Sequence, residues 1–494
     1  MESCVSSFPF TSDPFTLGVA SGDPLPDGVV LWTRLAPGPL AGVDLPQRAL
    51  AVEWEVATDE GMRQIARRGS ASALPDLAHS VHVEVSGLDP DRWYWYRFRS
   101  GGAESQIART RTAPAAGATP ERLRFAFASC QNYAQGYYTA YQHMAREDVD
   151  LVLFLGDYIY EGTARGGVRE YRSRTWSFSL RDYRDRYAQY KSDADLRAAH
   201  ALFPWILTWD DHEVENNYAG GVDAQDQRNK AFLAERAAAY QAYYEHQPLR
   251  AASLPKGPEL RLFRAPPFGD LATFHVLDTR QYRSAPAVRA CAQNERAPDG
   301  HCATALDPGR TMLGAEQRAW LTGGLGRSRA RWDVLAQSVR FAQHDFASEP
   351  DRHDFGDGDD WDGYVADRRA LLAAFARGPR NPVVVSGDSH RNYVYDLKAD
   401  FGDPRSPTVA TEFLGTSISS DGDPASPVTQ HDPSPKNPHW RFYDDHRGYV
   451  LCALDRRQWR TDFRIVSTVR APSATVSTVA SFGIEDRRPG AARG

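Results

Sequence analysis

Four mainly apolar runs constrain the fold of this chain more than any other feature. They cover residues 123–130, 149–157, 200–211 and 381–390. Strands that are covered on both faces read as continuous apolar runs, whereas half-exposed strands alternate. The four runs therefore predict an α/β fold with buried, mostly parallel strands.

Further elements of the same kind fill the rest of residues 122–494. Helical spacing of apolar residues recurs in 137–148, 232–246, 314–325 and 364–377. Two more strands are expected in 271–280 and 330–339, and a late antiparallel pair in 448–455 and 462–469. Strands interleaved with helices in this way are typical of α/β domains.

The first part of the chain has a different pattern. Short alternating or aromatic-rich runs occur in 28–35, 50–58, 79–88 and 92–100, with turn-forming residues between them. Such spacing favours a small all-β sandwich over residues 14–115. The Ala/Pro/Gly-rich residues that follow are typical of a linker, which we place at 116–121.

Composition and charge exclude some partners. The 494 residues carry 58 Lys+Arg against 64 Asp+Glu, a formal net charge of -6, and no basic tail. A nucleic-acid or anionic-membrane partner is therefore not indicated. No apolar run reaches the roughly 20 residues of a membrane helix, and residues 1–24 contain no export-signal pattern.

Two cysteines raise the question of redox compartment. Cys291 and Cys302 bracket a polar loop and are either a short disulfide hairpin or two unpaired thiols. A disulfide would indicate an oxidising compartment.

Side chains that can bind metals gather where the four apolar runs end. In open α/β sheets, ligands bind beyond the carboxyl ends of the strands. Four strands that all deliver donors to one edge predict a metal site. The candidate residues are Cys130, Asp157, Tyr160, Asp211, His212, Asn216, Asp388 and His390.

The chemistry of these donors indicates a mixed site. A phenolate with carboxylates, completed by a thiolate and an imidazole, suits ferric iron, which Cys130, Tyr160 and His390 would hold. Carboxylates with an Asn carbonyl suit calcium, magnesium or manganese. Asp157 lies between the two sets and is placed to bridge them. Ions about 4 Å apart suit in-line displacement at phosphorus, which indicates phosphoester hydrolysis.

Each candidate also has an ordinary structural explanation. Cys130 can be a small core residue, Tyr160 a packed tyrosine, Asp157 a helix cap and His212 a solvated loop residue. The Arg-rich stretch 171–190 is either a phosphate clamp or a helix and loop over the site. The joint pattern favours the metal site.

At this point the sequence resembles a known family, the PhoD-like alkaline phosphatases of the metallophosphoesterase superfamily. The resemblance runs in order from about residue 14 to residue 489. It is carried by the stretches 15–35, 125–133, 151–161, 207–218, 277–283, 359–368, 383–397 and 482–490.

The resemblance implies more than the residues alone. It implies a fibronectin- or immunoglobulin-like N-terminal domain, a four-layer α/β sandwich, and hydrolysis of phosphate monoesters and diesters with Fe3+ and Ca2+. The implied iron ligands are Cys130, Asp157, Tyr160 and His390. The implied calcium ligands are Asp157, Asp211, Asn216 and Asp388, with Mn2+, Zn2+ and Mg2+ as alternative ions. His212 matches the catalytic histidine, which contacts the phosphoryl oxygens or protonates the leaving group.

The sequence departs from the wider superfamily at two positions. Asp211 replaces an Asn and Asp388 replaces a His, and both changes favour a harder ion such as calcium over zinc. Asn217 competes with Asn216 as a ligand, and Asp210 is either a ligand or a support for one.

The family also implies a location and a set of partners. Its members act outside the cytoplasm, so an extracellular or periplasmic location and small-molecule phosphate esters are expected for a monomer. Two other functions compete with this one. They are a phospholipase D-like activity on lipid head groups and a non-catalytic binding protein.

Overall fold

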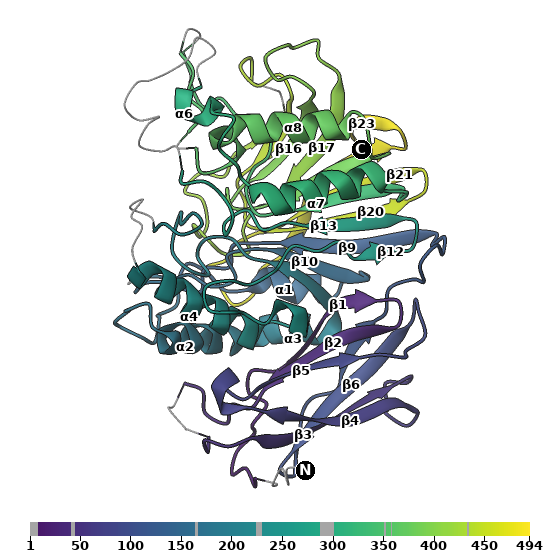
Figure 1. Ribbon diagram of the computed structural model, residues 1–494, viewed down its shortest axis with the longest axis vertical. Helices are drawn as coiled ribbons and strands as arrows, with labels where there is room; N and C mark the ends of the chain where they lie inside the picture. Colours follow the sequence, from purple (N-terminus) through teal and green to yellow (C-terminus); the bar gives the residue numbers. More distant parts are fainter. Residues whose placement is uncertain are drawn as a thin grey trace.

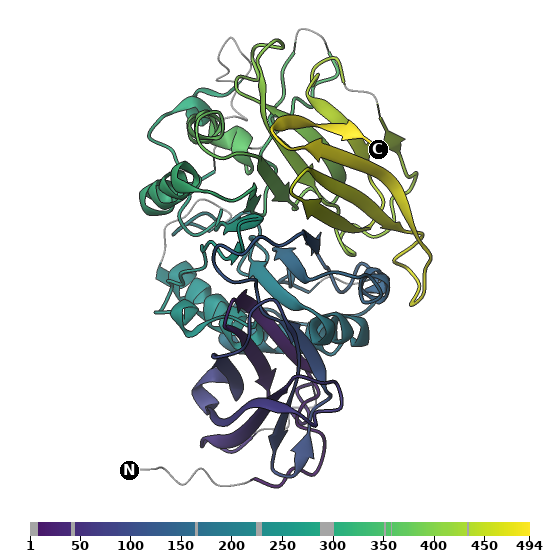
Figure 2. The ribbon, with the colours of Figure 1, turned by 90° about the vertical axis from the view of Figure 1, so that its right-hand side faces the viewer.

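The computed structural model describes residues 8–40, 45–163, 166–223, 230–286, 301–349, 352–356, 358–431 and 434–494. It is a mixed α/β structure with two large sheets, a smaller third sheet and few helices (Figure 1). Figure 2 places the purple N-terminal strands at one end of the molecule and the yellow C-terminal strands towards the other. Cys291 lies outside the described residues, and with it the predicted pairing with Cys302.

The first sheet has ten strands in the order β23-β22-β21-β20-β9-β10-β11-β1-β2-β5. The members from the first half of the chain are β1 (Val19–Leu25), β2 (Gly28–Arg34), β5 (Ser80–Val85), β9 (Arg122–Ala128), β10 (Leu151–Leu155) and β11 (Pro204–Thr208). The C-terminal members are β20 (Gly448–Asp455), β21 (Gln458–Val466), β22 (Val476–Glu485) and β23 (Arg488–Arg493).

The second sheet has eight strands in the order β12-β13-β14-β15-β17-β16-β19-β18. They are β12 (Pro267–Phe268), β13 (Ala272–Val276), β14 (Trp332–Ala336), β15 (Pro382–Ser386), β16 (Asn392–Lys398), β17 (Thr408–Leu414), β18 (Thr429–Gln430) and β19 (Trp440–Asp444). The third sheet contains β3 (Leu50–Ala57), β4 (Ile65–Ala73), β6 (Trp93–Ser100), β7 (Ala103–Glu104) and β8 (Ala108–Arg111).

Apart from the short helix Ala303–Leu306, the helices pack on the two large sheets. They are α1 (Thr139–Met144), α2 (Leu180–Lys191), α3 (Ala194–Leu202), α4 (Lys230–His246), α6 (Ala303–Leu306), α7 (Gly314–Arg327) and α8 (Val365–Phe375). Three short 3-10 helices are η1 (Pro75–Leu77), η2 (Ala251–Ser253) and η3 (Trp361–Gly363). None of the helices in the described part of the chain is long and apolar enough to cross a membrane.

The apolar runs alternate between two separate cores. On β9, Phe125 and Phe127 pack against the second sheet, whereas Ala126 lies in the core formed with α1 to α4. On β15, Val383 and Val385 face the first sheet, while Val384 packs in the core with α7 and α8. Both faces of these strands are thus covered, which explains why their sequences show no polar alternation. The expected buried strands are confirmed.

The N-terminal strands divide between two sheets: β3, β4, β6, β7 and β8 form the third sheet, whereas β1, β2 and β5 belong to the ten-stranded sheet. Strands β1, β2 and β5 pack face to face with the third sheet through a shared apolar core. At the same time β1 pairs in parallel with β11, with Ser21 opposite Pro204 and Gly22 opposite Trp205. The ten-stranded sheet therefore runs without a break from the predicted β-sandwich into the α/β part.

Gly22 is tightly enclosed at this junction, which yields a stability prediction. A Cβ atom there would lie 2.6 Å from the carbonyl oxygen of Pro248 and 2.8 Å from that of Trp205. We expect Gly22→Val to lower the free energy of unfolding by about 1–3 kcal/mol, because the backbone atoms cannot move away freely. Denaturant titration measures the change.

Gly326 provides the matched control for this change. It lies within α7, and a Cβ atom there would meet nothing within 4 Å. Gly326→Ala should leave the free energy of unfolding unchanged or raise it, since Ala favours helix. An equal loss in both variants would show that the β1–β11 junction has no special packing constraint.

Candidate metal centre

The predicted donors lie at the carboxyl ends of strands from both large sheets. In the first sheet, β9, β10 and β11 are parallel neighbours, and Cys130, Asp157 and Asp211 follow their ends. In the second sheet, Asp388 and His390 follow β15. The four strands therefore deliver their donors to one place, but they belong to two sheets rather than to the single sheet edge predicted from the sequence.

A close backbone approach brings the two sheets together here. Ser129, after β9, forms a parallel bridge with Ser417, after β17. Gly387, after β15, lies so near that a Cβ atom on it would be 2.3 Å from the Ser129 Oγ. The distance of this atom to the Ser129 Cβ would be 2.7 Å, so Ser129 would have to move, and the glycine of the "GDSH" sequence permits this close packing.

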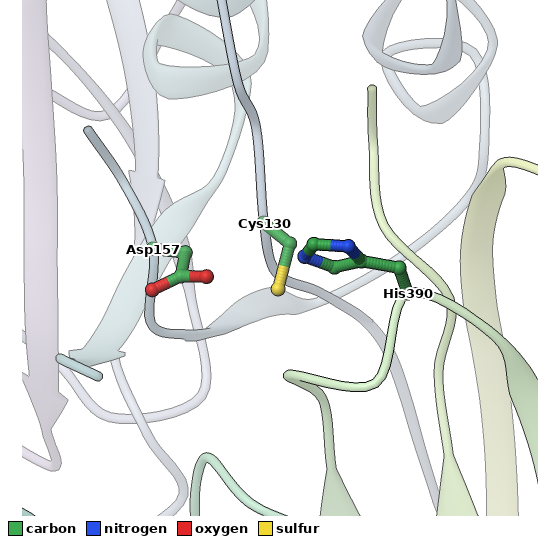
Figure 3. Close-up of side chains that lie close together, drawn as sticks. All are labelled: Cys130, Asp157 and His390. Atoms are coloured by element: carbon green, nitrogen blue, oxygen red, sulfur yellow. The ribbon is translucent and has the colours of Figure 1, made fainter. Parts of the chain in front are cut away.

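Four side chains make up the first donor group. Cys130, Asp157 and His390 offer ligand atoms that lie within 4.8 Å of one another, and Figure 3 shows Cys130 between the other two. Tyr160 joins them, because its hydroxyl is 2.7 Å from the Asp157 Oδ2 and 3.1 Å from the His390 Nε2. The structure thus brings together all four residues that the family resemblance assigns to iron.

A second donor group overlaps with the first, and a third overlaps with the second. Asp157, Asp211 and His212 form one of them, and Asp210, Asp211 and Asp388 form the other. Asp157 is shared with the first group and Asp211 links the second and third. This overlap is the arrangement that a bridging carboxylate between two ion sites requires.

Several donors are aimed by an unusual backbone conformation. Cys130, Asp157, Asp388 and His390 have φ values of 59°, 57°, 64° and 55°. Residues other than glycine rarely adopt this left-handed backbone conformation. Each one held there costs on the order of 1 kcal/mol or more of folding free energy. Such strain persists where the surrounding structure fixes it, and here it turns the donors towards one another.

The Asp157 and Asp210 side chains are buried, that of Asp388 is 31% exposed, and their charges are incompletely compensated. Burial raises the pKa of Asp157 well above its ordinary value, and the nearby His212 charge offsets only part of this effect. Burial also raises the pKa of Asp388, and the charge of Asp210 adds to the rise. The Asp157 Oδ1 and Asp210 Oδ2 are buried without a hydrogen-bond partner among the described residues. Unpaired, buried carboxylate oxygens of this kind fit bound cations.

Arg280 supplies a positive charge that was not anticipated from the sequence. Its buried guanidinium donates to the Asp210 Oδ1, and its Nη2 lies 3.7 Å from the Asp211 Oδ2 and 3.6 Å from the Asp388 Oδ1. Burial alone would raise the pKa of Asp211, yet Arg280 and His212 hold it below its ordinary value. Arg280 therefore keeps Asp211, the residue shared by the second and third donor groups, charged.

Asp359 connects Arg280 to a second buried arginine. It accepts from the Arg280 Nη1 at 2.8 Å and from the Arg283 Nη2 at 2.6 Å. The stretches 277–283 and 359–368 contributed to the family resemblance without assigned roles. Their role is to place two guanidinium groups and one carboxylate behind the donors.

Glu213 supports the loops that carry the donors. Its buried carboxylate accepts from the backbone N–H groups of Tyr158 at 2.6 Å, Asp210 at 2.9 Å and Asp157 at 3.2 Å. The loops after β10 and β11 are thereby held by one side chain.

His212 is paired with Glu161, a second residue that was not anticipated. The His212 Nδ1 lies 2.7 Å from the Glu161 Oε2, and the ring packs on Tyr160 with centroids 4.1 Å apart. Burial lowers the pKa of His212, but the charges of Glu161 and Asp211 outweigh it and raise the pKa well above 6.5. The pairing favours a protonated imidazole. Glu161 directly follows the predicted ligand Tyr160, and this position was the one sign in the sequence that Glu161 lies at the site.

The asparagines occupy more peripheral places. Asn216 is exposed, and its backbone N–H donates to the Glu161 Oε1 at 2.9 Å. The backbone N–H of Asn217 donates to the Asp211 Oδ2 at 2.7 Å. Coordination by the Asn216 side chain stays a prediction.

The Arg-rich stretch braces the site. Arg186 of α2 is buried and donates to the carbonyl oxygens of Tyr160 and Gly162. Its guanidinium carbon lies 3.7 Å from the ring centroid of Tyr171 and 4.8 Å from that of Trp176. Arg186 thus fixes the backbone that carries Tyr160 and Glu161. This structural role differs from both interpretations of the stretch, the phosphate clamp and the solvated helix and loop.

The environment of Arg280 generates a stability prediction. Arg280→Met would leave Asp210 and its neighbours buried without their cation, so we expect a loss of about 3–5 kcal/mol in the free energy of unfolding. Arg261 is the control, because its pair with Glu316 is exposed by 58% and 76%. Arg261→Met should change the same quantity by at most about 1 kcal/mol. Similar values for both variants in denaturant titrations would contradict the assigned role.

Comparisons with known proteins show which family the chain resembles. The PhoD-like phosphatase family matches residues 125–463, and the PhoD-like phosphatase N-terminal domain matches residues 3–114. Alkaline phosphatase D of Bacillus subtilis (strain 168) is 49% identical over 484 residues, which are 96% of this chain and 81% of the relative.

A solved structure of PhoD is similar over the whole fold. It is 47% identical, has a TM-score of 0.92, and the match covers 99% of this chain and 93% of that chain. The resemblance seen in the sequence is confirmed: the chain belongs to the PhoD-like phosphatase family.

Proposed function

We propose that this chain hydrolyses phosphate monoesters and diesters at the overlapping donor groups around Asp157. Membership of the PhoD-like phosphatases makes it a phosphoric ester hydrolase. The observation that carries the finer proposal is the sharing of Asp157 between a Cys/His group and an Asp/His group. Shared carboxylates of this type are characteristic of paired-ion sites for phosphoryl displacement.

The donor sets fit two kinds of ion. Cys130, Tyr160 and His390, with Asp157, would hold Fe3+, since phenolate, thiolate and imidazole suit that ion. Asp157, Asp211, Asp388 and Asn216 would hold Ca2+, for which oxygen ligands are suited, with Asp210 placed to contribute. The alternatives are Mn2+, Zn2+ and Mg2+. The chemistry that such ions supply when bound is polarisation of a phosphoryl oxygen and acidification of water.

The chain itself supplies the proton for the leaving group. Glu161 engages the His212 Nδ1, which leaves the Nε2 as the atom available to an ester oxygen. The raised pKa of His212 means that the ring keeps its proton to a higher pH than an ordinary histidine. This property supports a general acid that still works under alkaline conditions.

The remaining expectations belong to the same proposal. They are a four-layer α/β sandwich, a fibronectin- or immunoglobulin-like N-terminal domain over 14–115, a linker at 116–121, a catalytic domain over 122–494, an extracellular or periplasmic location, and a monomer. The packing of helices on the outer face of each large sheet supports the layer order.

Removal of the metal, or of the shared carboxylate, tests the proposal. Chelation or Asp157→Asn should lower kcat for an aryl phosphate and a bis-aryl phosphate by about 10³-fold or more, because the shared ligand and its charge are lost. Asp270→Asn, which removes a partly exposed carboxylate paired with Arg456, should keep full activity. Full activity after either treatment at the site would refute metal-dependent hydrolysis. Faster turnover of phosphatidylcholine than of these esters would instead favour the phospholipase D-like alternative.

The role of His212 gives a leaving-group prediction. His212→Ala should lower kcat/KM by about 10²–10⁴-fold for an alkyl phosphate, whose leaving group needs a proton. The loss should be much smaller for p-nitrophenyl phosphate, which departs unprotonated. Glu161→Gln should show the same dependence with smaller losses. Equal losses for both esters would rule out proton donation by His212 and leave it a role in binding the phosphoryl group.

A further inference from the structure

The segment after β17 lies directly behind the first donor group. We call residues 417–421 the support loop. The backbone N–H of Ile418 donates to the carbonyl oxygen of Ser129 at 3.0 Å, and that of Ser420 to the carbonyl oxygen of Cys130 at 3.3 Å. The support loop thus belongs to the second sheet but is fastened to the strand end that carries Cys130.

Ser420 contacts two members of the donor group. Its buried Oγ lies 2.7 Å from the Tyr160 hydroxyl and 2.8 Å from the Cys130 carbonyl oxygen, and it accepts from the Asn132 N–H at 3.1 Å. A serine hydroxyl has one hydrogen to donate. That hydrogen therefore goes either to the Tyr160 oxygen or to the Cys130 carbonyl.

The state of Tyr160 decides between these two acceptors. As a neutral phenol, Tyr160 donates its own hydrogen to the Asp157 Oδ2 at 2.7 Å. As a ligand of the proposed Fe3+, the Tyr160 oxygen would carry no hydrogen and would only accept. A charged acceptor binds a donor about twice as strongly as a neutral one, so the Ser420 hydrogen then goes to the phenolate.

Asp421 acts on His390 in the same group. Its Oδ2 lies 2.9 Å from the His390 Nδ1, while the backbone N–H of Asp421 donates to the Gln135 Oε1 at 2.7 Å. With Nδ1 held by a carboxylate, Nε2 is the nitrogen that faces Tyr160, at 3.1 Å. A carboxylate behind a histidine is the usual means of fixing a metal-binding ring.

A buried arginine ties the support loop to His390. The Arg447 Nη1 lies 3.0 Å from the Ser417 Oγ and 3.2 Å from the Ser420 carbonyl oxygen, and it also donates to the His390 carbonyl oxygen. Arg447 therefore holds the support loop and the backbone of His390 together.

From these contacts we infer that the support loop positions and tunes the Fe3+ ligands. Ser420 hydrogen-bonds to the phenolate form of Tyr160 and so weakens its electron donation, and Asp421 holds His390 for coordination through Nε2. Both are positioning residues, since neither is itself a proposed ligand. The inference rests on the proposed iron site, and its test separates the two.

Ser420→Ala in the full-length chain loaded with ferric iron tests the first part. The tyrosinate-to-iron absorption band should move to longer wavelength, because a phenolate without its hydrogen bond is a stronger donor. Ser419→Ala is the matched control: Ser419 is also buried in the support loop, but its Oγ donates to the Asn132 carbonyl oxygen at 2.9 Å. That variant should leave the band in place.

Asp421→Ala tests the second part through metal retention. Loss of a carboxylate behind a metal-binding histidine typically weakens metal affinity about 10–100-fold. We expect a loss of this size in iron affinity, and competition with a chelator measures it. Asp421→Asn keeps an acceptor oxygen and should recover part of the affinity. Asp423→Ala is the control. Asp423 accepts a hydrogen bond from the Val469 N–H at 2.8 Å and lies outside the contacts described for Cys130, Asp157, Tyr160 and His390. Thermal unfolding of the iron-free variants checks that each one folds.

The outcomes distinguish the two proposals. Wild-type chain that takes up no iron and shows no visible band would overturn the iron site and the support-loop inference together. A wild-type band that is identical in the Ser420→Ala variant, with unchanged iron retention in Asp421→Ala, would overturn the support-loop inference alone. A shifted band and weakened iron retention in these two variants, with both controls unchanged, would establish it.

Discussion

The close contact between Gly387 and Ser129 makes the site possible. The donors come from two sheets, and a side chain at residue 387 would push the sheets apart, since its Cβ atom would lie only 2.3 Å from the Ser129 hydroxyl oxygen. With glycine there, His390 from the second sheet reaches Cys130 and Asp157 from the first. The parallel β-bridge between Ser129 and Ser417 also joins the two sheets at this edge.

Charge compensation follows from this convergence. Bringing Asp157, Asp211 and Asp388 together in a buried place would be unfavourable without cations. The chain provides Arg280 as one fixed cation, and Asp359 holds Arg280 in place. The oxygens that Arg280 does not satisfy, on Asp157 and Asp210, are the ones available to metal ions. In the proposed site, Arg280 and the bound metal ions would share one acidic cluster.

Much of this arrangement could be predicted from the sequence. Continuous apolar runs marked β9, β10, β11 and β15, because strands covered on both faces lack alternation. The donors directly after them were found for the same reason. Arg280, Glu161 and Ser420 were not, since their contacts join segments far apart in the chain and no local pattern encodes them. The pairing of β1 with β11 was missed because strand order across a sheet is not a local property.

The proposed chemistry requires a metal ion bound at the first donor group. Anomalous X-ray scattering at the iron absorption edge, from crystals of the active protein as purified, locates such an ion without relying on activity. We expect an anomalous peak enclosed by Cys130, Asp157, Tyr160 and His390. Crystals of fully active protein with no metal density at that position would contradict the proposed site.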